Sequence, residues 1–125
     1  MSEEAIPSEV RQFLTDYIDS VVQLEALVLL HNNPSTEWDA QTLSARLYVG
    51  AAAAAAQMEE LCARGLAASR KESAVLYRYG PRTELARVAD AVVGAYARNL
   101  VQVATLIHSK PRAPIRHFAD AFRWR

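Results

Sequence analysis

The sequence has little of what secreted and membrane-spanning proteins depend on. It contains one cysteine, Cys62, which excludes an internal disulfide and agrees with a reducing, cytoplasmic environment. No apolar run approaches the ~20 residues that a membrane-spanning helix needs. The acidic start, MSEE at residues 1–4, is not followed by an apolar stretch, so we expect no secretory signal peptide.

Residues suited to catalysis or metal binding are also sparse. The four glycines do not cluster into a phosphate-binding loop, and no Ser, His and Asp arrangement typical of nucleophilic catalysis is present. The histidines, His31, His108 and His117, are scattered and lack a cysteine or carboxylate ligand set. We therefore expect a protein that is not an enzyme and that holds no metal or cofactor.

What is present is one domain's worth of an ordinary globular chain with an uneven distribution of charge. The 125 residues are 51% hydrophobic and 22% charged, with a net charge of zero. Residues 1–60 carry ten acids and two bases (−8), whereas residues 61–125 carry four acids and twelve bases (+8). This asymmetry indicates a basic contact surface in the second half or two halves that attract each other, unless both are simply solvated faces.

Hydrophobic spacing in the first half predicts helices whose ends carry recognisable signals. Ser20 and Gln23 have the spacing of a capping box, Asp39 is a good N-cap, and Gly65 is the expected left-handed residue after a helix. Asn32-Asn33-Pro34-Ser35 ends the second helix. The predicted helices are residues 8–19, 20–31, 40–47 and 51–64.

The second half predicts a hairpin and a long helix. Residues 66–69 and 74–79 are expected to be strands around the polar loop 70–73. An apolar stripe with a period near 3.67 predicts a nearly straight helix over residues 83–108, and prolines end it. Residues 114–124 are expected to form a short basic amphipathic helix. That segment either packs against a dimer or contacts nucleic acid, a partner or, least favourably, a membrane surface.

Taken together, these elements resemble the DNA-binding lobe of MarR-type bacterial transcriptional regulators. The resemblance rests on QLEALVLLH (residues 23–31), WDAQTLSARLYVG (38–50) and LCARGL (61–66). It implies a mainly α fold, a winged helix-turn-helix with an α/β wing hairpin, flanked by N- and C-terminal dimerisation helices. The single domain 1–125 would then contain an N-terminal helix (8–19), the winged lobe (20–82), a dimerisation helix (83–108) and the basic segment (114–124).

The resemblance also implies roles for individual residues in a homodimer that binds duplex DNA. Residues 51–64 would be the recognition helix, with Arg70 and Lys71 at the wing tip. The candidate DNA-binding residues are Ala52, Ala53, Ala56, Gln57, Arg64, Arg70, Lys71 and Arg78. The candidate dimer residues are those of the apolar stripe, Leu85, Val88, Val92, Tyr96, Leu100, Val103 and Ile107.

The run of six alanines, residues 51–56, complicates this assignment. At 100° per residue, the residues expected to face the core are Ala51, Ala54, Ala55, Met58, Leu61 and Cys62. The outward side from Ala52 to Arg64 offers only Gln57 and Arg64 for hydrogen bonds to bases. An uncharged apolar face is also typical of protein docking, which is the alternative function. A further possibility is that the N-terminal helix folds over the alanines. A ligand cleft near Tyr48, Tyr77 or Tyr96 is also compatible with the pattern.

Overall fold

The computed structural model describes residues 6–109 as six helices and a two-stranded hairpin. The predicted basic helix 114–124 lies outside the described residues. None of the described helices combines the length and the hydropathy that crossing a bilayer takes. The elements, in chain order, are α1 (Ser8–Tyr17), α2 (Val21–Asn32), α3 (Ala40–Leu47), α4 (Ala51–Ala63), β1 (Ala67–Lys71), β2 (Val75–Tyr79), α5 (Thr83–Arg98) and α6 (Leu100–Ser109).

The helix ends follow the capping signals of the sequence. The Ser20 hydroxyl accepts from the backbone amide of Gln23 at 3.1 Å, and the Asp39 carboxylate accepts from the backbone amide of Thr42 at 2.8 Å. The Gln23 side-chain oxygen accepts in turn from the backbone amide of Asp19 at 2.9 Å. In a capping box it would accept from the amide of Ser20, one residue later. After α4, Gly65 has a φ of 80°, the left-handed conformation that glycine adopts without strain.

The hairpin pairs with register Ala67↔Tyr79 to Lys71↔Val75. Arg70 and Lys71 were expected in the connecting loop, but they are the last paired residues of β1. The chain turns at Glu72, whose amide donates to the Ala74 carbonyl at 2.9 Å. Trp38 adds a bridge to Tyr77 on the other edge of β2, with two backbone bonds of 2.8 Å. The hairpin is therefore anchored to the segment that leads into α3.

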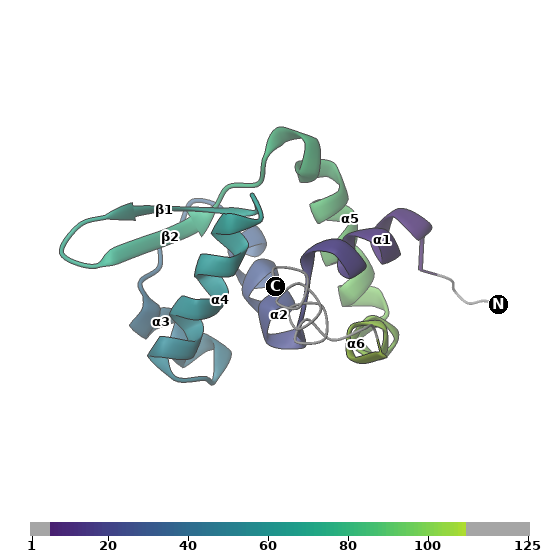
Figure 1. Cartoon of the computed structure of the whole chain (residues 1–125), viewed down its shortest axis with the longest axis horizontal. Coiled ribbons are helices and arrows are strands. Elements are labelled where there is room, and N and C mark those ends of the chain that lie inside the picture. Colours follow the sequence, from purple (N-terminus) through teal and green to yellow (C-terminus); the bar gives the residue numbers. More distant parts are fainter. Residues whose placement is uncertain (1–5, 110–125) are drawn as a thin grey trace, which may run out of the picture.

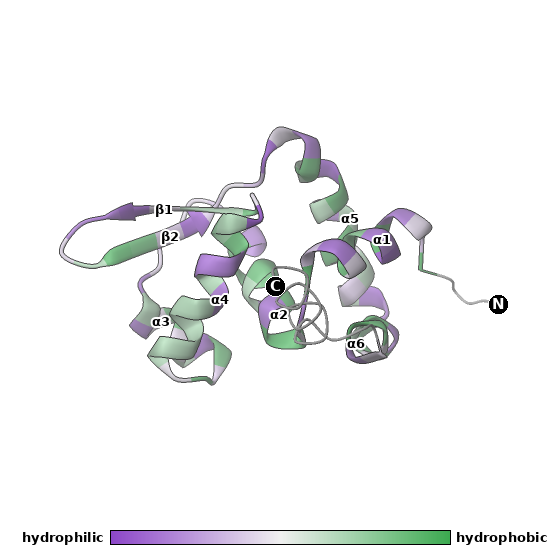
Figure 2. Cartoon of the chain, in the orientation of Figure 1, coloured by the Kyte–Doolittle hydropathy of each residue, from purple (hydrophilic) through white to green (hydrophobic). Residues whose placement is uncertain are grey.

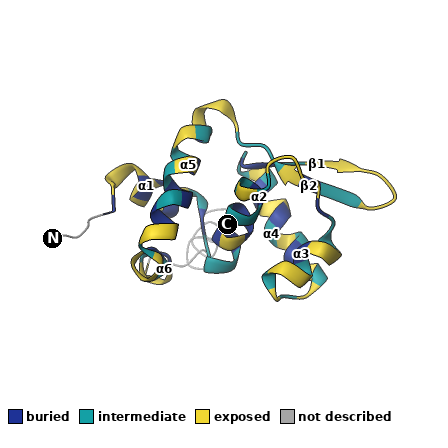
Figure 3. Ribbon diagram, turned by 180° about the vertical axis from the view of Figure 1, so that it is seen from behind, coloured by how far each residue is buried: buried dark blue, intermediate teal, exposed yellow. Residues whose placement is uncertain are grey.

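The elements form two groups with α2 between them (Figure 1). The first group consists of α3, α4 and the hairpin, which projects away from the rest of the chain. The second consists of α1, α5 and α6, which pack on one another. Buried residues lie on the inner faces of both groups, whereas much of the hairpin and the outer turns of α3 and α4 are exposed (Figure 3). The alanine run is not covered by the N-terminal helix, which lies in the other group.

The predicted single helix 83–108 is wrong in one respect, because it is interrupted at Asn99. This residue has φ −135° and ψ 54°, yet its amide still donates to Ala95 at 2.8 Å and its carbonyl still accepts from Val103 at 2.9 Å. A change at one residue therefore turns the chain with little loss of backbone hydrogen bonding. Since α6 then packs against α1 and α2, the apolar stripe is used inside the chain.

Candidate nucleic-acid interface

The outer face of α4 is made of alanine methyl groups. Ala52, Ala53 and Ala56 are exposed, whereas Ala54, Met58 and Leu61 are buried, so the face lies where the helical periodicity placed it. Tyr48, just before α4, is 93% exposed and has a φ of 60°. In Figure 2 part of α4 has the pale green of weakly hydrophobic residues, and the outer end of β1 has the purple of hydrophilic ones. This uncharged helix face beside a polar hairpin is the candidate interface.

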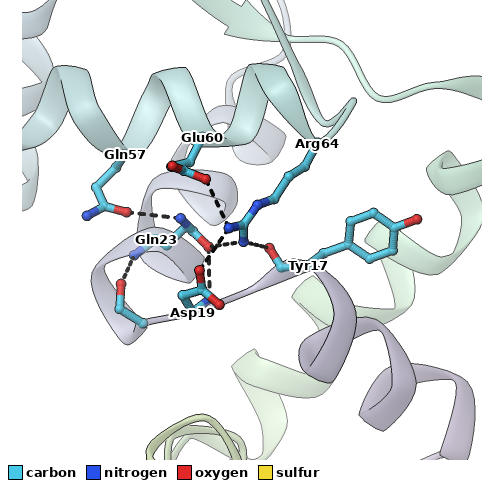
Figure 4. A network of polar contacts seen from close by, with 7 residues as sticks. Tyr17, Asp19, Gln23, Gln57, Glu60 and Arg64 are labelled. Atoms are coloured by element: carbon cyan, nitrogen blue, oxygen red, sulfur yellow. Dashed lines mark hydrogen bonds and ion pairs between the residues drawn. The ribbon is translucent and has the colours of Figure 1, made fainter. Parts of the chain in front are cut away.

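Arg64 was expected on that outer face, but it points inward (Figure 4). Its guanidinium donates to the Tyr17 carbonyl at 2.7 Å, to Gln23 Oε1 at 3.1 Å, to the Asp19 carboxylate at 2.8 Å and to Glu60 at 2.9 Å. These contacts join the end of α4 to the α1–α2 junction. They satisfy most of the donors of the guanidinium, so Arg64 is not available to hydrogen-bond a base edge.

Gln57 is also held from within the chain. Its Oε1 accepts from the side-chain amide of the buried residue Gln23 at 3.2 Å, as Figure 4 shows. Farther along α4, the Tyr77 hydroxyl donates to Glu59 at 2.8 Å, which joins the hairpin to the helix. Burial and this hydrogen bond raise the pKa of Tyr77 to about 12. The polar side chains of α4 therefore serve mainly to fix the helix in place.

The cations of the hairpin differ in how free they are. Arg70 forms a two-bond pair with Glu37, at 2.7 and 2.9 Å, and also contacts Glu72. The hydrogen bonds to Glu37 and Glu72 raise the pKa of Arg70, and the bond from Arg70 lowers the pKa of Glu37. Lys71 and Arg78 are exposed, and within residues 6–109 neither forms an ion pair. They are the cations most available to a phosphate backbone.

The predicted dimer residues lie mostly inside the chain. Leu85, Val92, Tyr96, Val103 and Ile107 are buried, and Val88 is half-buried. Leu100 is 54% exposed at the start of α6, next to Val101, which is 72% exposed. An interface in this region would therefore use the α5–α6 junction rather than the whole stripe. Sequence periodicity could not show this, because the stripe continues unbroken across Asn99.

Of the three tyrosines expected near a ligand cleft, Tyr96 lines a cleft in the structure. Tyr96 contributes to a cleft of about 670 Å³ between α2 and α5, together with Val28, Val93, and the hydrogen-bonded pair His31 and Asp90. Burial, together with a 2.6 Å hydrogen bond to Glu25, raises the pKa of Tyr96 to about 12. Tyr77 is buried and Tyr48 points into solvent, so neither belongs to this cleft.

A two-helix unit (α3 and α4) followed by a hairpin that is braced by Trp38 defines a winged helix-turn-helix, and the predicted fold class is confirmed. Solved structures share this fold. HlyU from Vibrio cholerae, in its reduced form, has a TM-score of 0.53 and 24% identity, over 74% of this chain and 90% of its own. A MarR family protein from Bacillus stearothermophilus has a TM-score of 0.52 and 23% identity, over 93% and 79%.

A third similar structure is the homodimeric winged helix-turn-helix DNA-binding domain of a possible ArsR-family transcriptional regulator from Mycobacterium bovis. Its TM-score is 0.55 at 18% identity, over 80% of this chain and 94% of that domain. No protein family model and no curated protein sequence matches this chain. At these identities the likeness shows the fold, and the function has to be argued from the interface itself.

Proposed function

We propose that this chain is a DNA-binding transcriptional regulator that acts as a homodimer on duplex DNA. The observation that carries the proposal is the placement of α4 in the same group of elements as the hairpin (Figure 1), whose Lys71 and Arg78 are exposed and form no ion pair within residues 6–109. In the helix-turn-helix geometry the second helix enters the major groove while neighbouring cations contact the backbone. Fold likeness to regulators, one of them described as homodimeric and DNA-binding, supports the same function.

The charges of α4 favour one way of inserting it. Its first six residues, 51–56, carry no charge, and the helix N-terminus bears a partial positive charge. Glu59 and Glu60 lie in the second half of α4 and are exposed, so phosphates would repel this end. The N-terminal half is therefore the part that would enter the groove, with the hairpin beside it on the backbone.

The function is tested by measuring affinity for a labelled mixed-sequence duplex over a series of salt concentrations. Each phosphate contact contributes about 0.9 to the slope of log affinity against log salt. Replacing Lys71 and Arg78 together by alanine should make the salt dependence shallower, reducing the magnitude of the slope by roughly two, and leave the fold intact. The matched control removes two exposed arginines, Arg11 and Arg98, from the α1–α5 group, and its slope should equal that of the unmodified chain.

The second candidate function is docking of a protein partner. The salt series separates it from DNA binding, because docking does not require any affinity for a duplex. Docking is favoured by a specific observation: two of the predicted DNA-contacting cations, Arg64 and Arg70, are neutralised by carboxylates, while the ring of Tyr48 and the alanine face of α4 are exposed. If no duplex binds even at low salt, DNA binding is refuted. Loss of a captured partner on Ala53→Arg would then support docking.

The pairing of Arg70 leads to a further expected result. Glu37→Gln removes the carboxylate of the two-bond pair with Arg70, leaving only the contact with Glu72. The change should strengthen binding to the same duplex roughly fivefold at low salt, with a salt slope larger by about one. Glu9→Gln is the matched control, because it breaks an ion pair of 3.1 Å between Glu9 and Arg87. This pair lies in the α1–α5 group, away from the hairpin (Figure 1). An affinity of Glu37→Gln no higher than that of the control would show that Arg70 gains no phosphate contact when its pair with Glu37 is lost.

A further inference from the structure

The exposed face of α4 over residues 51–56 carries only methyl groups, which limits the kind of group it can recognise. The proposed function does not say which feature of the duplex that is. Ala52, Ala53 and Ala56 lie within an arc of about 100° and span about 6 Å along the helix axis, which is close to the rise of two base pairs. Alanine side chains carry no donor or acceptor. Whatever this patch distinguishes, it distinguishes through apolar contact.

The polar alternatives on α4 are already used within the chain. Gln57 accepts from Gln23, and Glu60 pairs with Arg64, while Glu59 accepts from Tyr77. Gln57 could form the two-bond contact that distinguishes adenine only by giving up its bond from Gln23, and Arg64 could contact guanine only by leaving its carboxylates. Among the described residues of α4 and its C-cap, neither is therefore set to contact a base edge with two bonds. The methyl patch is thus the part of the helix that can discriminate between sequences.

The major groove offers one apolar group, the C5-methyl of thymine, and alanine is among the side chains that contact it. The lobe that carries the patch also has charges that suit a duplex, since Lys71 and Arg78 are exposed on the hairpin that follows α4 and residues 51–56 are uncharged. A methyl group buried between the two surfaces contributes roughly threefold to fourfold in affinity. Two such contacts would give about tenfold.

We propose that Ala52, Ala53 and Ala56 select the DNA site by packing against thymine methyl groups in the major groove. This inference rests on the proposed function, and it adds the feature of the duplex that is recognised. It predicts a preference for methyl groups as such, rather than for A·T pairs through their hydrogen-bonding edges.

The test uses two pairs of 20-base-pair duplexes that differ only in the C5-methyl. One pair has alternating dA with dT or with dU, and the other has alternating dG with dC or with 5-methyl-dC. Fluorescence anisotropy at low salt should show about tenfold weaker binding to the dU duplex than to the dT duplex. Methylation of dC should strengthen binding to the second duplex, because it places a methyl group at the same position in the groove.

Variants of the helix locate the effect. Ala53→Ser with Ala56→Ser adds one hydroxyl oxygen to each of two side chains and makes them polar. Since Ala52 keeps its methyl group, the dT-to-dU affinity ratio should fall from about tenfold to no more than about fourfold. Ala63→Ser is the matched control, because Ala63 is exposed on the same helix but outside the N-terminal half. Its ratio should stay near that of the unmodified chain.

The outcomes separate this inference from the proposed function. Equal affinities for the dT and dU duplexes, with binding that weakens as salt rises, would overturn methyl recognition and leave DNA binding intact. A ratio that persists in the double serine variant would also overturn the role of these alanines. Absence of binding to all four duplexes would overturn both proposals together.

Discussion

Replacing Arg64 by alanine should lower the free energy of unfolding by about 2–3 kcal/mol. The guanidinium joins three parts of the chain, because it donates to the Tyr17 carbonyl, to Asp19 and to two side chains that face it from α2 and α4 (Figure 4). Breaking a fully buried ion pair costs about 3–5 kcal/mol. The expected value is smaller because the side chains of Arg64 and Asp19 are 22% and 24% exposed.

Urea unfolding followed by circular dichroism measures this loss, and two variants identify its source. Arg64→Lys keeps the charge but cannot reproduce the planar fork of donors, so its stability should lie between those of the alanine variant and the unmodified chain. Combining Arg64→Ala with Asp19→Asn should cost less than the sum of the two single changes, because the lone carboxylate is removed as well.

The matched control for Arg64→Ala is Arg78→Ala, which removes an exposed arginine that forms no ion pair among the described residues and donates one long hydrogen bond, of 3.5 Å, to the Tyr79 carbonyl. That change should alter stability by no more than about 0.5 kcal/mol. If Arg64→Ala were as mild, the network in Figure 4 would contribute nothing to the position of α4.

The parts of this structure that sequence could predict are those set by neighbours along the chain. The bounds of α3, the start of α4, the cap at Ser20 and the left-handed Gly65 all depend on residues within four positions of one another. The outward placement of Ala52 and Ala53 follows from helical periodicity in the same way.

What sequence could not predict depends on residues that meet only after folding. Arg64 and Asp19 are 45 positions apart, so charge counting treated Arg64 as a free base. The pairing of Arg70 with Glu37, 33 positions away, was missed for the same reason. The break at Asn99 left no trace in the pattern, because the spacing of Tyr96, Leu100 and Val103 suits a straight helix as well as a broken one.

The alanine run leads to the second large expected effect, which concerns its buried side. Ala54 is 0% exposed, and α4 packs there against α2 and α3, so the helices approach as closely as a methyl group permits. Ala54→Leu adds three carbon atoms to a filled core and should lower the free energy of unfolding by about 2–3 kcal/mol, since overpacking forces neighbouring side chains and backbone to shift.

Ala53→Leu provides the matched comparison, because it makes the same chemical change one residue earlier, on the exposed face. Its unfolding free energy should stay within about 0.5 kcal/mol of the original, since both residues are good helix formers. Equal midpoints for the two leucine variants in urea would mean that Ala54 is not packed as the structure shows. A difference confined to Ala54 would establish that one side of the run serves packing, while the other side remains free for a partner.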